Sequence, residues 1–361
     1  MSYAIAGVIE RHDRARFDAI GISFGPDDRS EMRSRLVGAF DQFHDVTAWD
    51  TSEVARLLRD LQVTIAVDLM GYTNGCRPGI LALRPAPIQV NAIGYPGTMG
   101  TDFIDYVIAD RFALPFEQQQ FYTEKIVHLP DCFLPHDATR RISPRTPSRA
   151  EAELPERGFV FCAFTNPAKI TAAMFDVWMN LLNEIEGGVL WLSRASELVA
   201  ANLRRAAEIR GVDPGRLVFA VRLEANEDHL ARHRLADLYL DTLPYNAHST
   251  AGDALWAGLP LVTCSGNSFA SRAAGSQLCA LGVPELVTNS LAEYQALASR
   301  LAGEPGLLRA IGAKIEQNRL RSPLFDMERY CRHIEAAYTT MRNLHRRGES
   351  PRSFSVDAIK G

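Results

Sequence analysis

Apolar runs of strand length alternate with amphipathic runs of helix length along most of the chain. In the first third, residues 17–25, 63–71, 88–97 and 105–110 have the length and composition of buried strands, and 52–62 and 76–84 have a helical pattern. Strands that alternate with helices indicate a mainly parallel sheet covered on both faces. This part of the chain is therefore predicted to be an α/β unit.

A second alternation begins near residue 158. Its predicted strands are 159–164, 188–194, 217–221, 235–241 and 259–265, its predicted helices are 172–185, 197–211, 226–234 and 249–258, and helices dominate after residue 290. Residues 141–157 are rich in Pro, Arg and Ser without an apolar period, which is typical of a linker. Two doubly wound halves are expected to bind a ligand in the cleft between them, at the carboxyl ends of their strands.

Composition excludes several classes of protein. The chain has 361 residues with 39 basic and 43 acidic side chains, a net charge of -4 and no basic tract beyond 342–352, so no nucleic-acid partner is expected. The six cysteines form no C-x-x-C pair and have no His at ligand spacing, which favours reduced thiols, no metal site and a cytoplasmic location. No run approaches the roughly 20 apolar residues of a membrane helix, and the N-terminus lacks signal-peptide features.

The segment 241–263, "DTLPYNAHSTAGDALWAGLPLVT", places polar side chains where a predicted helix begins after a predicted strand. The helix N-terminus, the hydroxyls of Ser249 and Thr250 and the ring of His248 together suit a phosphate or diphosphate. Asp253 lies one turn deeper, where a carboxylate suits sugar hydroxyls. The pattern therefore predicts a nucleoside diphosphate site. The alternative is a helix N-cap with a buried histidine nearby.

Two further polar residues follow predicted strands. Lys169 lies a short loop beyond 159–164, and His229 lies inside the helix that follows 217–221. Both are expected at the level of the cleft, although a solvated loop lysine and a helix-surface histidine are the plainer interpretations. No dinucleotide fingerprint follows a strand and no P-loop is present. His12 is expected to face solvent from a helix, and Asp27–Asp28 to form a turn and helix cap.

Four blocks give the chain a resemblance to a known family: 71–110, 235–263, 268–287 and 321–330. From about residue 3 to 345 it resembles the catalytic C-terminal region of the O-linked N-acetylglucosamine transferase family, the SPINDLY-like group of inverting GT-B glycosyltransferases. The resemblance implies two Rossmann-like halves: 1–140 and 158–323 around the linker 141–157, then a helix at 324–346 packing back towards the N-terminal half and a tail at 347–361.

The resemblance also implies roles for individual residues. It implies that UDP is the donor nucleotide, that its diphosphate is held by His248, Ser249, Thr250 and Lys169, that its ribose approaches Asp253 and that its uracil packs near His229. Asn166 belongs to the loop ahead of the lysine. The sugar side is implied to be lined by Gly94, Tyr95, Pro96, Gly97 and Thr98, with Tyr95 and Lys169 as the catalytic candidates.

The implied reaction transfers N-acetylglucosamine from UDP-GlcNAc to Ser or Thr of a polypeptide with inversion. A lysine, hydroxyls and a helix N-terminus can stabilise the departing UDP, so neither a metal ion nor a cofactor is expected. Members that use GDP-fucose leave a protein O-fucosyltransferase as an alternative. The donor loop differs from the family at Asn226 and at 165–168.

The N-terminus also differs from the family. The first strand of the N-terminal half and the histidine loop after it have no counterpart in the sequence, and no internal 34-residue repeat is found. A nucleotide-sugar-binding remnant that does not catalyse is therefore a second hypothesis, with UDP binding but little or no transfer expected. An epimerase or a free-sugar glycosyltransferase is a third.

Overall fold

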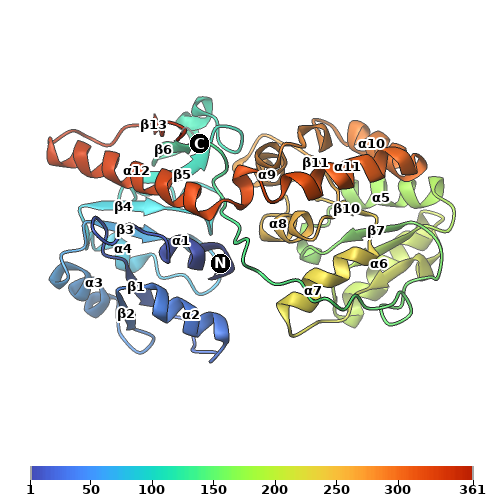
Figure 1. Ribbon diagram of the computed structural model, residues 1–361, viewed down its shortest axis with the longest axis horizontal. Helices are drawn as coiled ribbons and strands as arrows, with labels where there is room; N and C mark the ends of the chain where they lie inside the picture. The colour runs from blue at the N-terminus through green and yellow to red at the C-terminus, as the bar shows by residue number, and fades with distance from the viewer. Residues whose placement is uncertain (1, 360–361) are drawn as a thin grey trace. The chain divides into compact units, whose positions relative to one another are not determined.

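The computed structural model describes residues 2–359, which fold into two α/β units (Figure 1). Unit 1 comprises Met1–Asp137 and Pro323–Gly361, and unit 2 comprises Ala138–Ser322. No helix among the described residues is long and apolar enough to cross a membrane. The α/β class predicted from the alternation of patterns is confirmed in both units.

Unit 2 is built on one continuous parallel sheet with the strand order β12-β11-β10-β7-β8-β9. The strands are β7 (Val160–Ala163), β8 (Val189–Leu192), β9 (Leu217–Phe219), β10 (Leu238–Leu240), β11 (Leu261–Cys264) and β12 (Val287–Thr288). The first five lie inside the predicted runs. Almost every residue in these five strands is buried, as expected for a parallel sheet with helices on both faces.

Helices of unit 2 follow the strands in regular alternation. They are α5 (Ala172–Glu184), α6 (Glu197–Ile209), α7 (Asn226–Arg232), α8 (Ser249–Trp256), α9 (Ala273–Leu281), α10 (Leu291–Gly303) and α11 (Pro305–Asn318), with the short turns η2 (Pro167–Lys169), η3 (Pro214–Arg216), η4 (His233–Leu235), η5 (Phe269–Ser271) and η6 (Pro284–Leu286). Thr171, Ser196 and Ser290 cap α5, α6 and α10 by accepting a hydrogen bond from a backbone N–H of the first turn. These caps explain why the helices begin where they do.

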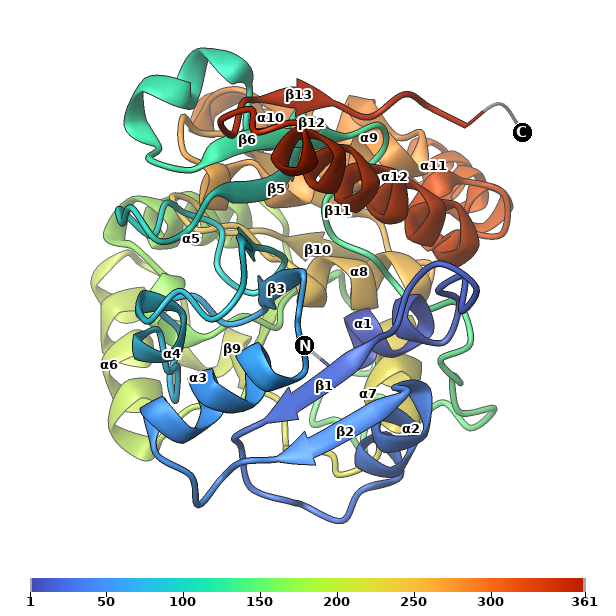
Figure 2. The same cartoon turned by 90° about the vertical axis from the view of Figure 1, so that its left-hand side faces the viewer.

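The sheet of unit 1 is divided. One part is a five-stranded parallel sheet with the order β13-β6-β5-β4-β3, and the other is the parallel pair β1-β2 (Figure 2). The strands are β1 (Ile20–Ser23), β2 (Gln42–Asp45), β3 (Ile65–Asp68), β4 (Ile88–Asn91), β5 (Tyr106–Asp110), β6 (Lys125–Leu129) and β13 (Phe354–Ser355). The predicted runs contain β1, β3, β4 and β5, whereas β2, β6 and β13 were not predicted.

Helices of unit 1 come from both ends of the chain. They are α1 (Ser2–Ile9), α2 (Glu31–Ala39), α3 (Thr51–Asp60), α4 (Gly79–Ala82) and α12 (Met327–Arg346), with the turns η1 (Phe116–Phe121) and η7 (Pro323–Phe325). One apolar face of α12 packs with Val8 of α1 and with residues of β4, β5 and β6 in a single core cluster. The C-terminal helix therefore belongs to the N-terminal unit.

Residues 347–361 are more than the tail that was predicted. Phe354 and Ser355 form β13, which pairs in parallel with Val127 and His128 of β6. The ring of Phe354 lies edge-on to Tyr106, with ring centroids 6.2 Å apart. A strand of two residues is too short to show a hydrophobic period, which is why the sequence did not reveal it.

Residues 141–157, predicted as a linker, belong to unit 2 and are held to its other residues by hydrogen bonds. The Ser143 N–H donates to the Glu227 carbonyl at 3.1 Å, and Arg234 donates to the Ser143 carbonyl at 2.9 Å. Leu154 is buried with 5% of its surface exposed. No helix or strand forms in this segment, so its sequence has no apolar period. Backbone and arginine hydrogen bonds hold it in place instead.

His12 is not the solvent-facing helix residue that was predicted. Helix α1 ends at Ile9, and the His12 side chain is only 8% exposed, with Nδ1 3.0 Å from Oε1 of Glu335. The Cys331 thiol lies 3.5 Å from the same Nδ1. Residues 331 and 335 share one face of α12, so the fold groups three side chains of metal-binding types that sequence spacing could not connect. Mutual hydrogen bonds connect these three side chains.

Candidate active site

The order of strands in unit 2 changes direction at β7. The chain adds β8 and β9 on one side of β7, then crosses to place β10 on the other side and continues to β11 and β12. In a doubly wound sheet, the loops that leave the carboxyl ends of the two strands at such a point separate and form the usual ligand site. Those loops are 164–171 after β7 and 241–248 after β10.

Lys169 joins the two loops. Its Nζ donates a hydrogen bond to the Asn246 carbonyl at 3.0 Å and lies 4.2 Å from the centre of the Tyr245 ring. Asn166 shapes the first loop, because its side-chain oxygen accepts from the Ala168 N–H at 3.0 Å. Burial lowers the pKa of Lys169, and the charge of Asp241 partly offsets that effect. Among the described residues, no carboxylate forms an ion pair with this lysine.

Asp241 holds the second loop in shape. Its carboxylate is buried and accepts hydrogen bonds from the N–H groups of Thr242 and Ala247, at 2.7 and 2.6 Å, and from the Thr263 hydroxyl at 2.6 Å. Burial raises the pKa of Asp241 to about 7. Sequence reasoning did not single out this residue. An acidic residue directly after the apolar run 238–240 was the signal that could have revealed it.

Helix α8 starts at this site with the three polar residues that the sequence singled out. His248 occupies the N-cap position without a side-chain cap, and its ring stacks on Tyr245 with centroids 4.9 Å apart. Burial and then the charge of Lys169 lower the pKa of His248 to about 4, so the ring is neutral at pH 7. Ser249 is exposed, whereas Thr250 is half-buried and lies near the Tyr239 hydroxyl.

Asp253 has two partners one turn further along α8. Arg140 forms an ion pair with its Oδ1, and Nε2 of His229 lies 3.9 Å from its Oδ2. The Arg140 carbonyl in turn accepts from the Trp256 indole at 3.0 Å. The structure thus brings together Asp253 and His229, both predicted, and adds Arg140. The sequence offered no sign of Arg140, because it stands among other arginines before an aperiodic segment.

His229 lies in a group of rings. It is 5.0 Å from His233 and 6.0 Å from Phe164, measured between ring centroids. Arg232 extends over the Phe164 ring at 4.4 Å and donates to the Val221 carbonyl at 2.8 Å. Burial lowers the pKa of His229 to about 4 and that of His233 to about 3. Both rings are therefore neutral at pH 7, and His229 is the one that is not fully buried.

The predicted loop 94–98 belongs to unit 1, where it follows β4. The amide of Asn91 donates to the carbonyls of Tyr95 and Gly97 at 3.4 and 3.2 Å, and the Thr98 hydroxyl donates to the buried Glu124 carboxylate at 2.6 Å. Asn91 and Glu124, which sequence reasoning missed, therefore fix the shape of the loop.

The Tyr95 side chain packs on a glycine. A Cβ added to Gly71 would stand 2.3 Å from Cβ of Tyr95, and Gly71 has a φ of 53°, so only glycine suits this position. The Tyr95 ring also meets Tyr72 edge-on, with centroids 5.6 Å apart. Gly94, Tyr95, Pro96, Gly97 and Thr98 thus form one ordered loop, and their predicted roles at a sugar stay predictions.

Comparison of this chain with models of protein families identifies its family. The model described as glycosyl transferase family 41 matches residues 1–146 and 142–334. The chain belongs to glycosyl transferase family 41. This agrees with the family that the sequence blocks resemble.

Curated relatives of this family 41 chain are longer proteins. It is 34% identical over 362 residues to the probable UDP-N-acetylglucosamine–peptide N-acetylglucosaminyltransferase SEC of Arabidopsis thaliana, covering 99% of this chain and 37% of that protein. It is also 30% identical to the probable UDP-N-acetylglucosamine–peptide N-acetylglucosaminyltransferase SPINDLY of Oryza sativa. That match covers 100% of this chain and 39% of the relative. The chain therefore spans less than half the length of these relatives.

Solved structures give the same fold. A mutant of the O-GlcNAc transferase of Thermobaculum terrenum matches with a TM-score of 0.87 and 30% identity, covering 96% of this chain and 66% of that one. Anabaena HepE, solved with UDP and glucose, matches with a TM-score of 0.62 and 12% identity, covering 94% and 95%. The GT-B class predicted for this family 41 chain is confirmed.

Proposed function

We propose that this family 41 chain is the catalytic region of an inverting glycosyltransferase that moves N-acetylglucosamine from UDP-GlcNAc to Ser or Thr of a polypeptide in the cytoplasm. The observation that supports it most is the contact between Lys169 and the loop before α8, at the point where the strand order of unit 2 reverses. That contact joins a lysine, which has no carboxylate partner among the described residues, to the start of an eight-residue helix. Both the lysine and the helix N-terminus favour a negatively charged ligand.

The diphosphate is proposed to lie against the N-terminus of α8. There the Lys169 ammonium, the exposed Ser249 hydroxyl and backbone N–H groups can donate to phosphate oxygens, and His248 adds its ring. Thr250 lies in the first turn of α8 with Ser249, so it remains a candidate to contact the diphosphate. The same donors would stabilise the negative charge that grows on UDP as the bond to the sugar breaks.

The chemistry of the carboxylates supports a reaction without a metal ion or cofactor. Asp241 already accepts three hydrogen bonds, and Asp253 is paired with Arg140. Both acids thus already have protein donors, and a metal ion would have to compete with these donors. We therefore propose that Lys169 and the helix N-terminus supply the positive charge that a metal supplies in other transferases.

The nucleoside is proposed to lie beside His229 and Asp253. The neutral ring of His229, which is only partly buried, suits the face or edge of uracil, and the Asp253 carboxylate suits ribose hydroxyls. Support for a peptide acceptor comes from the curated relatives, which are named as peptide N-acetylglucosaminyltransferases. The acceptor itself and the placement of the sugar near the loop 94–98 rest on the resemblance.

The test is a donor and acceptor assay in EDTA. The whole chain is offered UDP-GlcNAc, UDP-glucose and GDP-fucose in competition, together with a mixture of Ser- and Thr-containing peptides, and products are identified by mass spectrometry. We expect UDP-GlcNAc to bind in preference, and any transfer to place GlcNAc on Ser or Thr. Transfer in Lys169→Ala should be about 10²–10³-fold slower, as for the loss of one charge-stabilising donor.

Lys314→Ala is the matched control. This lysine also lies in unit 2, but it is exposed and paired with Glu285 at 2.6 Å. It should leave donor binding and transfer unchanged. Preference for GDP-fucose, strict dependence on a metal ion, or conversion of UDP-GlcNAc without a peptide would each contradict the proposal.

A further inference from the structure

Three side chains of metal-binding types meet in unit 1, between the segment that follows α1 and one face of α12. Nδ1 of His12 lies 3.0 Å from Oε1 of Glu335 and 3.5 Å from Sγ of Cys331. The Cys331 sulfur lies 3.7 Å from the same carboxylate oxygen. A nitrogen, a sulfur and an oxygen atom thus form a small triangle, which the fold assembles from segments more than 300 residues apart.

This triangle has the size of one face of a tetrahedral zinc site. Zinc binds imidazole nitrogen at about 2.0–2.1 Å, carboxylate oxygen at about 2.0–2.2 Å and thiolate sulfur at about 2.3 Å. Tetrahedral angles then place nitrogen and oxygen about 3.4 Å apart, and sulfur about 3.6 Å from each of them. The observed separations are 3.0, 3.5 and 3.7 Å, so shifts of a few tenths of an ångström bring all three atoms onto one ion.

The burial and charge of the three side chains suit a divalent cation. Cys331 is 1% exposed, Glu335 is 5% exposed, and the His12 side chain is 8% exposed. A thiolate and a carboxylate carry two negative charges, which balance those of Zn²⁺ where little water is present. Magnesium and calcium prefer oxygen ligands, whereas sulfur and imidazole nitrogen suit zinc. This set of donors therefore favours Zn²⁺.

Neighbouring groups hold the three side chains in orientation. The Asp13 N–H donates to Oε1 of Glu335 at 2.8 Å, and the His12 ring packs near the Phe17 ring, with centroids 5.7 Å apart. Cys331 and Glu335 are four residues apart on α12, so the helix places both side chains on one face. Partners of this kind orient metal ligands and raise their affinity for the ion.

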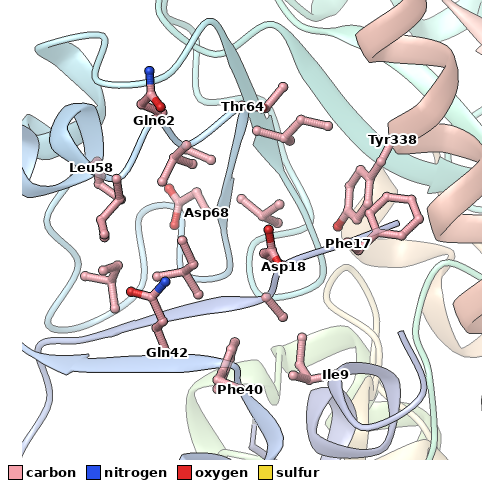
Figure 3. Close-up of a pocket in the computed structure, with 18 of the residues that line it drawn as sticks. Ile9, Phe17, Asp18, Phe40, Gln42, Leu58, Gln62, Thr64, Asp68 and Tyr338 are labelled. Carbon is pink, nitrogen blue, oxygen red and sulfur yellow. The ribbon is translucent and has the colours of Figure 1, made fainter. Parts of the chain in front are cut away.

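A cavity beside His12 offers a path for the ion and for water. His12 lines this space of about 750 Å³ in unit 1 together with Phe17 and Tyr338. Figure 3 shows Phe17, Asp18 and Tyr338 among the side chains of its lining. Charged residues such as Arg16 and Asp18 make the space suitable for water. Water from this cavity can complete a zinc site that has three protein ligands.

We propose that His12, Cys331 and Glu335 bind one Zn²⁺ ion, with water as the fourth ligand, and that this ion stabilises unit 1 by joining the segment after α1 to α12. When the ion binds, the Cys331 thiol releases its proton to the solvent, and the neutral His12 ring binds through Nδ1. All three ligands belong to unit 1, whereas the residues proposed to bind the donor diphosphate belong to unit 2. EDTA should therefore remove this ion without preventing UDP binding.

The test titrates the whole chain, reduced and freed of metal, with Zn²⁺ and with Co²⁺ as a spectroscopic substitute. We expect one equivalent of Zn²⁺ to bind with release of a proton and to raise the melting temperature. Co²⁺ should give a thiolate charge-transfer band in the near ultraviolet and the intense visible bands of four-coordinate cobalt. X-ray absorption at the zinc edge should show one sulfur at about 2.3 Å and the other ligands at about 2.0–2.2 Å.

Cys331→Ser keeps the size of the side chain and removes the thiolate. It should weaken Zn²⁺ binding about 100-fold or more and abolish the charge-transfer band, because loss of even an outer partner of a metal ligand costs about 10–100-fold. Cys76→Ser is the matched control, since Cys76 is a half-buried cysteine of unit 1 outside the cluster. It should bind both metals as the unaltered chain does.

Three results would overturn the proposal. They are no binding at micromolar free Zn²⁺, a zinc environment with no sulfur or with more than one, and equal affinity in Cys331→Ser and the unaltered chain. The first would show that hydrogen bonds alone hold the cluster. The X-ray absorption and cobalt spectra are recorded on the unaltered chain, so they decide the matter even if Cys331→Ser does not fold.

Discussion

Units 1 and 2 share one architecture but differ in how complete their sheets are. In unit 2, six parallel strands form a continuous sheet, and the loops after β7 and β10 meet through the contact between Lys169 and Asn246. In unit 1, the sheet is divided between β1 and β3, and most residues of these two strands are only half-buried. A ligand site built on strand ends needs those strands held in place, so the complete unit is the better candidate for donor binding.

The largest expected effect is on unit 2, from loss of Asp241. Asp241→Ala leaves two backbone N–H groups and the Thr263 hydroxyl buried without their acceptor, so we expect a loss of about 3–5 kcal/mol in the free energy of unfolding. Urea unfolding followed by the fluorescence of the buried Trp178 and Trp191 measures it. The control is Asp213→Ala, which removes an exposed acceptor for the Gly215 N–H and should cost less than about 1 kcal/mol. Similar losses in the two variants would show that the Asp241 network does not hold the loop.

In unit 1, two glycines with positive φ, Gly71 and Gly75, test how rigidly the loop 94–98 is held. Gly71→Ala combines left-handed strain with a clash against Tyr95, so it should destabilise by about 2–4 kcal/mol. Gly75→Ala has a φ of 80° but open space around the new Cβ, so only the strain of about 1–2 kcal/mol should remain. Differential scanning calorimetry measures both. Equal costs would mean that Tyr95 is free to move away and that the loop 94–98 is not rigid.

A smaller effect separates nucleoside from phosphate contacts in unit 2. Asp253→Asn keeps the size of the side chain and removes its charge, so UDP should bind about 1–2 kcal/mol more weakly while inorganic pyrophosphate binds as before or slightly better. Arg140→Met, which removes the partner of Asp253, is the companion variant. Titration calorimetry with both ligands decides. Equal losses for UDP and pyrophosphate would mean that Asp253 supports α8 instead of contacting ribose.

An effect of similar size is the pH dependence of unit 2. The pKa values of His229 and His248 fall to about 4 and that of His233 to about 3 in the folded state, so the stability they contribute is present above pH 6.5 and is lost as the pH falls towards 4. Asp241 opposes them, because its pKa is raised to about 7 and its contribution is lost as the pH rises through 7. Three histidines outweigh one acid.

From pH 7.5 to 5.5 we therefore expect a net loss of about 1–2 kcal/mol, measured by urea unfolding with tryptophan fluorescence. Asp241→Asn removes the opposing group, so its loss over the same range should be larger. A unit 2 that is more stable at pH 5.5 than at 7.5 would contradict the burial of these histidines as neutral rings.

The contrast between the units also shows what sequence patterns can predict. Apolar runs such as 159–164 and 259–265 predicted the buried strands of unit 2, because a fully buried strand has an apolar sequence. Strand β2 has the sequence "QFHD" and no fully buried residue, so it gave no such run. A strand without an apolar run, such as β2, is therefore missed by pattern reasoning.

The candidate site was predictable to the same extent. Lys169 and His248 could be found because both follow apolar runs, and parallel strand ends meet at one edge of a sheet. Arg140 and Glu124 could not, since each acts through a partner that is distant in sequence, and no local spacing records such a contact. Asn91 donates to carbonyls of its own loop, at Tyr95 and Gly97, and no apolar period marks such a contact. His12 failed for the same reason, because its partners lie more than 300 residues away on α12.

The central claim is that Lys169 and the start of α8 bind a nucleoside diphosphate, and titration calorimetry of UDP with the whole chain in EDTA tests it most directly. The account predicts that UDP binds without a metal ion, that Lys169→Ala weakens binding by about 1.5–3 kcal/mol, the worth of a hydrogen bond to a charged group, and that Lys314→Ala binds as the unaltered chain does. Unchanged affinity in Lys169→Ala, or binding that disappears in EDTA, would contradict it.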